Sequence, residues 1–94
     1  MHIARLLVDI QLPGCRSLKD KRGRLRHLKD KFGANPNVAV SESSYHDRHD
    51  CAQWCFVVIG ADQAIVSAQL QRIEDHVHQS VDGYVTRCER DFLA

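Results

Sequence analysis

Residues 2–20 read HIARLLVDIQLPGCRSLKD, and this stretch contains a strand, a turn and the start of a helix. Within His2 to Leu12, apolar side chains occupy every second position, which is the period of a strand with one buried face. Pro13-Gly14 then predicts a turn. Ser17 stands three residues before Asp20, and this capping-box spacing favours a helix start. The stretch therefore predicts a strand followed by a helix that begins at Ser17.

Two helices are indicated by apolar stripes at helical spacing. The first stripe consists of Leu18, Leu25, Leu28 and Phe32. Gly33 and Pro36 predict the end of this helix after about 15 residues. Asp62 can cap the second helix, and its stripe consists of Val66, Leu70, Ile73 and Val77. Residues Ser80 to Gly83 are expected to end it.

Three further segments have the character of strands. Asn37–Ser44 has a weak strand pattern. Cys51–Gly60 is rich in aromatic and β-branched residues, as a central strand is. In Tyr84–Phe92 polar and apolar residues alternate, which predicts the last strand. The resulting order βαββαβ is that of a ferredoxin-like sandwich, an α+β fold with a four-stranded antiparallel sheet and two helices on one face. With 94 residues, the chain predicts one such domain over residues 1–94.

Composition places the chain among ordinary globular proteins, with 44% hydrophobic and 27% charged residues. No apolar run reaches the roughly 18–20 residues of a membrane span, and Asp9 interrupts what would be the apolar core of a signal peptide. We therefore expect a cytoplasmic protein with no membrane partner. In that compartment the four cysteines, Cys15, Cys51, Cys55 and Cys88, are expected to be reduced thiols.

The formal net charge of +1 hides a strong asymmetry. The segment Arg16–Lys31 has eight basic and two acidic residues, a net +6, whereas the rest of the chain carries −5. On the predicted helix, one flank displays Lys19, Arg22, Arg26 and Lys29 over about 15 Å, and Arg16 extends this row at the helix start. Cations at phosphate spacing favour binding to nucleic acid, structured or ribosomal RNA in particular. The alternative is a solvated helix face that is merely basic.

The two faces of the predicted sheet differ in character. Trp54 and Phe56 share one face, where they are expected to form the core. The other face is expected to display an apolar set made of Ile3, Leu7, Cys55, Val57 and Ile59. An apolar open face without aromatic rings favours a protein partner or a homodimer over base stacking. This protein interface is the main alternative to RNA binding.

One polar cluster has the residue types of a metal site, namely His46, His49 and Cys51. An H-x-x-H pair in a loop lacks the helical spacing of zinc proteases, so these are weak candidates, and we predict no metal and no cofactor. Lys21 lies on the buried side of the predicted helix and is expected to pair with Asp9 or Glu42.

No motif of an enzyme is present. The sequence lacks a P-loop, a nucleophile elbow and a dinucleotide-binding glycine motif. Arg16 stands where an acylphosphatase-like hydrolase has its phosphate-binding arginine, which leaves that hydrolase as a minor alternative. We predict no catalytic residues, no small-molecule substrate and no enzymatic activity.

The segment Leu12–Arg22, LPGCRSLKDKR, resembles the corresponding segment of the small bacterial YlxP-like family, a domain of unknown function. Val38–Glu42 and Val57–Asp62 are similar to that family's second and third strands. The resemblance implies a ferredoxin-like fold. Through the family's gene neighbourhood among translation and ribosome-assembly factors, it also implies a role with RNA or the ribosome. The His- and Cys-containing stretch Tyr45–Cys55 departs from the family pattern.

Overall fold

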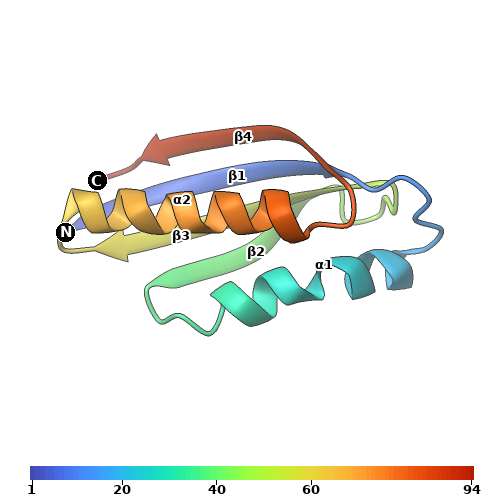
Figure 1. Ribbon diagram of the computed structural model, residues 1–94, viewed down its shortest axis with the longest axis horizontal. Coiled ribbons are helices and arrows are strands. Elements are labelled where there is room, and N and C mark those ends of the chain that lie inside the picture. The colour runs from blue at the N-terminus through green and yellow to red at the C-terminus, as the bar shows by residue number, and fades with distance from the viewer.

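The computed structural model describes residues 1–94 and has the element order βαββαβ. The elements are β1 (His2–Gln11), α1 (Leu18–Phe32), β2 (Val38–Ser44), β3 (Cys51–Gly60), α2 (Gln63–Ser80) and β4 (Tyr84–Phe92). The strands form one sheet in the order β2-β3-β1-β4, and every neighbouring pair is antiparallel. In Figure 1, α2 is drawn over β1 and β3, and α1 lies beside the edge strand β2. Both helices contribute to one core with Phe56, so they cover the same face of the sheet. The predicted ferredoxin-like sandwich is confirmed.

The alternation of β1 decides which face of the sheet is covered. Ala4, Leu6 and Val8 are fully buried, whereas their odd-numbered neighbours are only partly buried. Leu6 pairs with Phe56 and Val8 with Trp54 across β1 and β3, so these two aromatic side chains face the core as predicted. Burying large aromatic and branched side chains on one face supplies most of the stabilisation of such a sandwich.

The connection from β1 to α1 follows the predicted turn and cap. Gly14 has φ +76°, in the left-handed region that favours glycine. The Ser17 hydroxyl then accepts a hydrogen bond from the backbone N–H of Asp20 at 3.0 Å. This cap satisfies one of the free N–H groups of the first helical turn, and α1 begins at Leu18.

The two helices cover different parts of the sheet. α2 packs on β1, β3 and β4, whereas α1 packs mainly against the edge strand β2, as Figure 1 shows. Leu28 of α1 and Leu70 of α2 nevertheless belong to one hydrophobic core of 18 buried residues. The helices meet at an edge-to-face contact of His27 and His76, with ring centroids 5.6 Å apart.

The opposite face of the sheet is not covered by any helix. Its apolar residues are partly buried and contiguous, because Ile3 pairs with Ile59 and Leu7 with Cys55 across β1 and β3. Arg5 lies between Ile3 and Leu7 on the same face, opposite Val57, and forms an ion pair with Asp91 of β4. The open face therefore carries the five expected apolar residues together with a paired charge that was not expected.

Two further expectations concern the cysteines and the helices. All four cysteines are free thiols, with Cys15 and Cys51 buried. Neither helix is long and apolar enough to cross a membrane.

Candidate nucleic-acid interface

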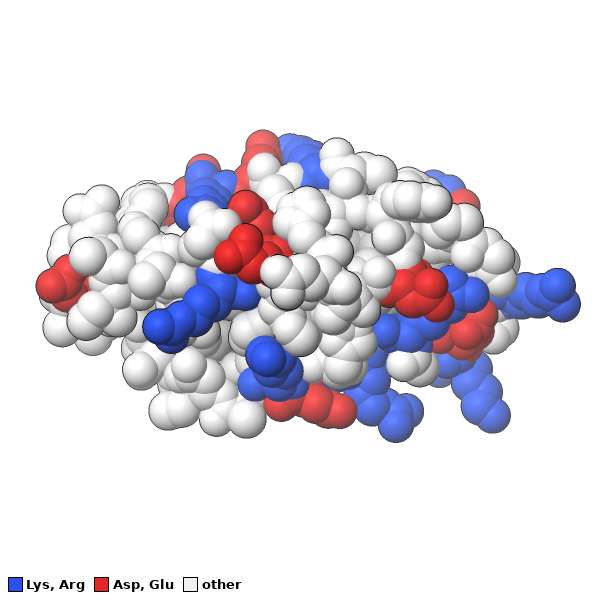
Figure 2. Space-filling view, in the orientation of Figure 1, with Lys and Arg blue, Asp and Glu red and all other residues white.

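Five cations lie along one flank of α1 and its N-terminus. We call this set the cationic ridge; it consists of Arg16, Lys19, Arg22, Arg26 and Lys29, and all five are exposed. Figure 2 shows Lys and Arg side chains gathered over α1 along the lower right edge of the molecule. The helical spacing expected from the sequence therefore places these residues together on one surface.

No residue of the cationic ridge makes an ion pair. Arg24, on the other flank of α1, forms two ion pairs. Its guanidinium lies 3.3 Å from the carboxylate of Asp20 and 3.7 Å from that of Asp82. Asp20 and Asp82 therefore neutralise Arg24, Glu42 is paired with Lys21, and none of these carboxylates forms an ion pair with the ridge. Exposed charges in this state keep their full attraction for an anionic partner.

Asp20 holds the start of α1. Hydrogen bonds from Arg24, and then one from the backbone N–H of Arg16 at 3.3 Å, lower the pKa of its carboxyl group. Asp20 is therefore ionised at neutral pH, and its negative charge interacts favourably with the positive N-terminal end of the α1 dipole.

A groove runs between α1 and the edge strand β2, directly beside the cationic ridge. One wall consists of Arg22, Arg26 and Lys29. The other wall and the floor consist of Val40, Ser41, Glu42 and Trp54. The groove has a volume of about 330 Å³. A smaller cavity of about 50 Å³ shares Arg22, Glu42 and Trp54 with it.

This groove is not predicted by the sequence patterns. Its lining comes from α1, β2 and β3, which only the folded chain brings together: α1 lies beside β2 (Figure 1), and Trp54 of β3 reaches the groove from the next strand. One signal was available: Val40 and Glu42 share a face of their strand, and that face pairs with Phe56 and Trp54. This register places Glu42 on the helix side of the sheet.

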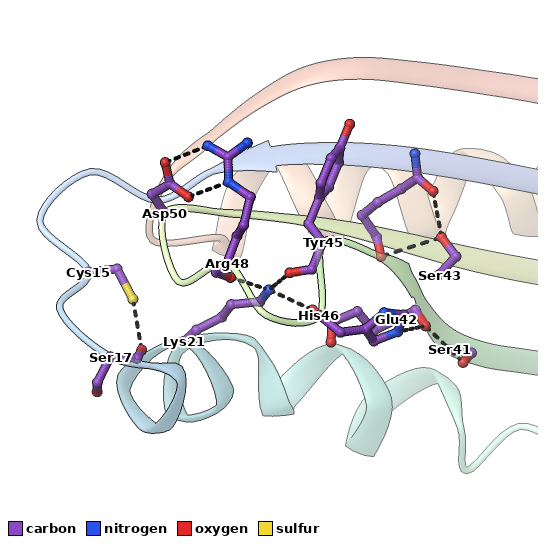
Figure 3. Close-up of polar contacts among 11 residues, drawn as sticks. Cys15, Ser17, Lys21, Ser41, Glu42, Ser43, Tyr45, His46, Arg48 and Asp50 are labelled. Carbon is purple, nitrogen blue, oxygen red and sulfur yellow. Dashed lines mark hydrogen bonds and ion pairs between the residues drawn. The ribbon is translucent and has the colours of Figure 1, made fainter.

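Lys21 is buried at one end of this region, with 3% of its surface exposed. Its Nζ atom donates to the backbone oxygens of Tyr45 at 2.8 Å and Arg48 at 2.7 Å, and lies 2.9 Å from the carboxylate of Glu42 (Figure 3). Of the two partners expected for Lys21, the structure has Glu42. Asp9 lies on the open face instead and accepts a hydrogen bond from Gln53 at 2.9 Å.

The Lys21 ammonium therefore links α1 to β2 and to the loop of residues 45–50. In that loop Tyr45 has φ +60°, a conformation that costs free energy for a residue other than glycine. Three oxygen partners satisfy all three N–H donors of the buried ammonium, as a buried charge requires.

The weak metal candidates do not form a ligand set. His46 Nε2 lies 3.0 Å from the backbone oxygen of Glu42, and Cys51 is buried under the loop. Burial also raises the pKa of the Cys51 thiol, which disfavours the thiolate that binds metals. Nowhere in the chain do three or more His, Cys, Asp or Glu side chains lie close enough to hold a metal ion.

Solved structures similar to this chain share its fold. A de novo designed protein with a ferredoxin fold matches with a TM-score of 0.60 and 12% identity, covering 100% of this chain and 87% of the designed one. A provisionally named chlorite dismutase matches with a TM-score of 0.59 and 15% identity over 98% of this chain. The chain spans only 44% of that protein's length.

A provisionally named antibiotic biosynthesis monooxygenase from Bordetella bronchiseptica matches with a TM-score of 0.50 and 13% identity, covering 97% of this chain and 96% of its own. At these identities the matches establish the ferredoxin-like class of fold.

Within that class, the model of the family described as "Protein of unknown function (DUF503)" matches residues 3–90, and the chain belongs to this family. No curated protein matches the sequence.

Proposed function

We propose that this chain is a non-catalytic, cytoplasmic RNA-binding protein of the YlxP-like kind, and that it binds structured RNA, ribosomal RNA foremost, through the cationic ridge. One observation carries the proposal: five exposed cations follow one helix flank without a single ion pair. Such cations bind phosphates and release condensed counterions, which drives sequence-independent association with nucleic acid. Base contacts would add specificity.

The test is a salt titration of binding to a short RNA hairpin, with charge-matched variants. Arg22→Glu combined with Arg26→Glu reverses two cations of the ridge. Lys31→Glu combined with Arg72→Glu reverses two exposed cations that lie off the ridge and make no ion pair. The net charge is the same in both variants, so a difference between them reports position and not total charge.

We expect the slope of log affinity against log salt to weaken by about 2 in the ridge variant, because each of the two reversed cations accounts for roughly one unit through its phosphate. The control variant is expected to keep a slope near that of the wild type. Equal reductions of this slope in the two variants would contradict an RNA-binding site localised on the ridge. If the wild type does not bind any RNA at low salt, the proposal fails and the ridge is a solvated face.

The minor alternative, an acylphosphatase-like hydrolase, would require Arg16 to hold a phosphate beside free backbone N–H groups. The backbone N–H of Arg16 already donates to Asp20, so an acidic side chain lies where that phosphate would bind. This disfavours hydrolysis. Turnover of an acyl phosphate that is abolished in Arg16→Ala would favour it.

The open face of the sheet supports a second candidate function, that of a homodimeric interaction module. Ile3, Leu7, Cys55, Val57 and Ile59 form its apolar stripe. On β3 this stripe is continuous through Cys55, Val57 and Ile59, whereas on β1 Arg5 lies between Ile3 and Leu7 and is paired with Asp91. A partly apolar surface that also carries paired charges is typical of a non-obligate protein interface. Dimerisation would also double the number of cationic ridges.

Sedimentation of the wild type and two variants tests the dimer. Leu7→Glu places a charge in the centre of the open face and is expected to give a monomer from a dimeric wild type. Ile65→Glu changes an exposed apolar residue of α2, away from that face, and is expected to leave the mass unchanged. A monomeric wild type at high protein concentration would exclude this candidate.

A further inference from the structure

We infer that the groove between α1 and β2 is a binding site for a single unstacked nucleotide, which an RNA chain bound along the cationic ridge would insert. Three cations of the ridge also form a wall of the groove. Where the nucleotide belongs to an RNA chain, the inference therefore rests on the proposed function. The same chemistry could come from a free nucleoside monophosphate. The experiment below separates the two sources.

The cationic wall supplies the phosphate contacts. Arg22, Arg26 and Lys29 line the groove, are exposed and make no ion pair. Arg22 and Arg26 stand one helical turn apart and Lys29 nearly one turn further, so their side chains lie along about 10 Å of the helix flank. Arginine is well suited to this role because its planar fork binds two phosphate oxygens at once.

The floor supplies an apolar surface. Val40 is partly buried, and Trp54 is 8% exposed and lines both the groove and the smaller cavity that adjoins it. The indole N–H of Trp54 is buried and has no hydrogen-bond partner in the protein, although buried tryptophan usually finds one. An acceptor atom that reached the base of the groove could satisfy it. A simple inorganic anion would leave this apolar floor unused.

The wall opposite the cations carries an acceptor. The Glu42 carboxylate lies in the groove with one oxygen, Oε2, 2.9 Å from Lys21 Nζ. The buried ammonium therefore fixes the carboxylate and balances its charge, and leaves the other oxygen able to accept N–H groups from the edge of a base. A carboxylate facing three cations fits a ligand that has both a phosphate and N–H donors.

The dimensions favour one nucleotide over a duplex. A volume of about 330 Å³ is at the lower end of the roughly 300–1,000 Å³ typical of ligand pockets. Double-stranded RNA does not present its base edges to such a groove, whereas loops and bulges extrude bases that proteins bind on their Watson–Crick edge. We therefore expect the RNA bound on the ridge to have an unpaired nucleotide.

Trp54 provides the measurement, because it is the only tryptophan in the chain. Its fluorescence is recorded while the protein is titrated with AMP, CMP, GMP or UMP, and with inorganic phosphate at the same ionic strength. Two RNA hairpins of equal length follow, each closed by the same non-nucleotide linker so that neither has unpaired loop bases. One is fully paired, and the other has a single bulged nucleotide. We expect a saturable change with at least one mononucleotide and with the bulged hairpin, and no change with phosphate.

Two substitutions to phenylalanine form a matched pair. Val40→Phe fills the groove without a change of charge and is expected to abolish the mononucleotide response and the preference for the bulged hairpin. Ala39→Phe adds the same side chain one residue away, on the open face, and is expected to leave both unchanged. Thermal melting checks that each variant folds. Should Val40→Phe not fold, Lys29→Gln, at an exposed position, is expected to weaken mononucleotide binding at least several-fold.

The outcomes separate this inference from the proposed function. RNA binding that does not distinguish the two hairpins, without any change of Trp54 fluorescence, would overturn the groove site and leave the ridge intact. A response to phosphate equal to that of every mononucleotide would overturn it as well, because it would indicate an anion site only. A mononucleotide response without any RNA binding would support the groove as a site for a free nucleotide and overturn the proposed function.

Discussion

The two faces of α1 carry the same kind of residue in opposite states. On the inner face, Lys21 is buried and has three oxygen partners. On the outer flank, Arg22 and Arg26 are exposed and have no ion pair. A count of charges along the segment does not distinguish these residues. The fold distinguishes them, because it brings oxygen acceptors to Lys21 and no ion-pair partner to Arg22 or Arg26.

The difference separates cations that stabilise the fold from cations that are available to a partner. A buried charge without partners costs several kcal/mol, so Lys21 must be satisfied for α1 to pack. An exposed cation is solvated and contributes little to stability. The same comparison holds at β4, where Arg87 lies 2.8 Å from Glu89 and is therefore compensated.

The largest effect is expected from removing the charge on the inner face. Lys21→Met leaves the Glu42 carboxylate and two backbone oxygens without their donor, and we expect a loss of about 3 kcal/mol in the free energy of unfolding. Urea denaturation measures it. Lys19→Met, at an exposed position of the same helix, is the control and should change stability by less than about 0.5 kcal/mol. Equal free energies of unfolding for the two variants would contradict a stabilising role for the buried Lys21 ammonium.

A smaller effect is expected at the helix start from which both faces project. Ser17→Ala removes the hydroxyl that accepts from the N–H of Asp20, and we expect a loss of about 1 kcal/mol. Ser44→Ala, at the end of β2, removes a hydroxyl that makes no hydrogen bond, and it is the control for the loss of a serine hydroxyl. A loss in Ser17→Ala no larger than in Ser44→Ala would mean that the cap does not contribute.

A pH dependence is expected where α1 meets α2. Burial, and then the charges of Lys31 and His27, lower the pKa of His76 below its ordinary value of 6.5. The unfolded chain therefore binds this proton more readily, so the stabilisation is present above pH 6.5 and is lost progressively as the pH falls below it. Thermal melting between pH 8 and pH 5 measures this slope. His76→Gln should reduce it, and an unchanged slope would exclude His76 as its source.

The smallest effect on stability is expected on the outer flank. Arg22→Gln with Arg26→Gln removes two like charges spaced i, i+4, and we expect a change within about 0.5 kcal/mol, with a slight gain from relieved repulsion. The melting temperature measures it, and the RNA titration above measures the loss of binding in parallel. A loss of more than about 1 kcal/mol would mean that the ridge has a structural role.

Much of the fold could be predicted from local periodicity. The alternation of His2–Leu12 and the capping serine at Ser17 predicted β1 and the start of α1, and the observed bounds differ by one residue at most. The stripe that contains Val66 and Ile73 predicted the buried face of α2. Each of these signals lies within one element, which is why sequence alone reveals them.

The candidate site could be predicted only in part. The cationic ridge lies on a single helix, so its spacing was visible in the sequence. The groove depends on the packing of α1 against β2 and on the register that pairs Glu42 with Trp54, and neither is encoded in one segment. The same limit applies to Lys21: its burial followed from helical angle, whereas its carbonyl partners in the 45–50 loop did not.

Those carbonyl partners have a consequence for how this chain can evolve. Lys21 holds the loop of residues 45–50 through the backbone oxygens of Tyr45 and Arg48, and every amino acid supplies a backbone oxygen. The loop can therefore exchange its side chains with little effect on its path, apart from Tyr45, whose φ of +60° restricts the choice. A loop with two histidines, as here, and a loop with other side chains can thus be held by the same lysine.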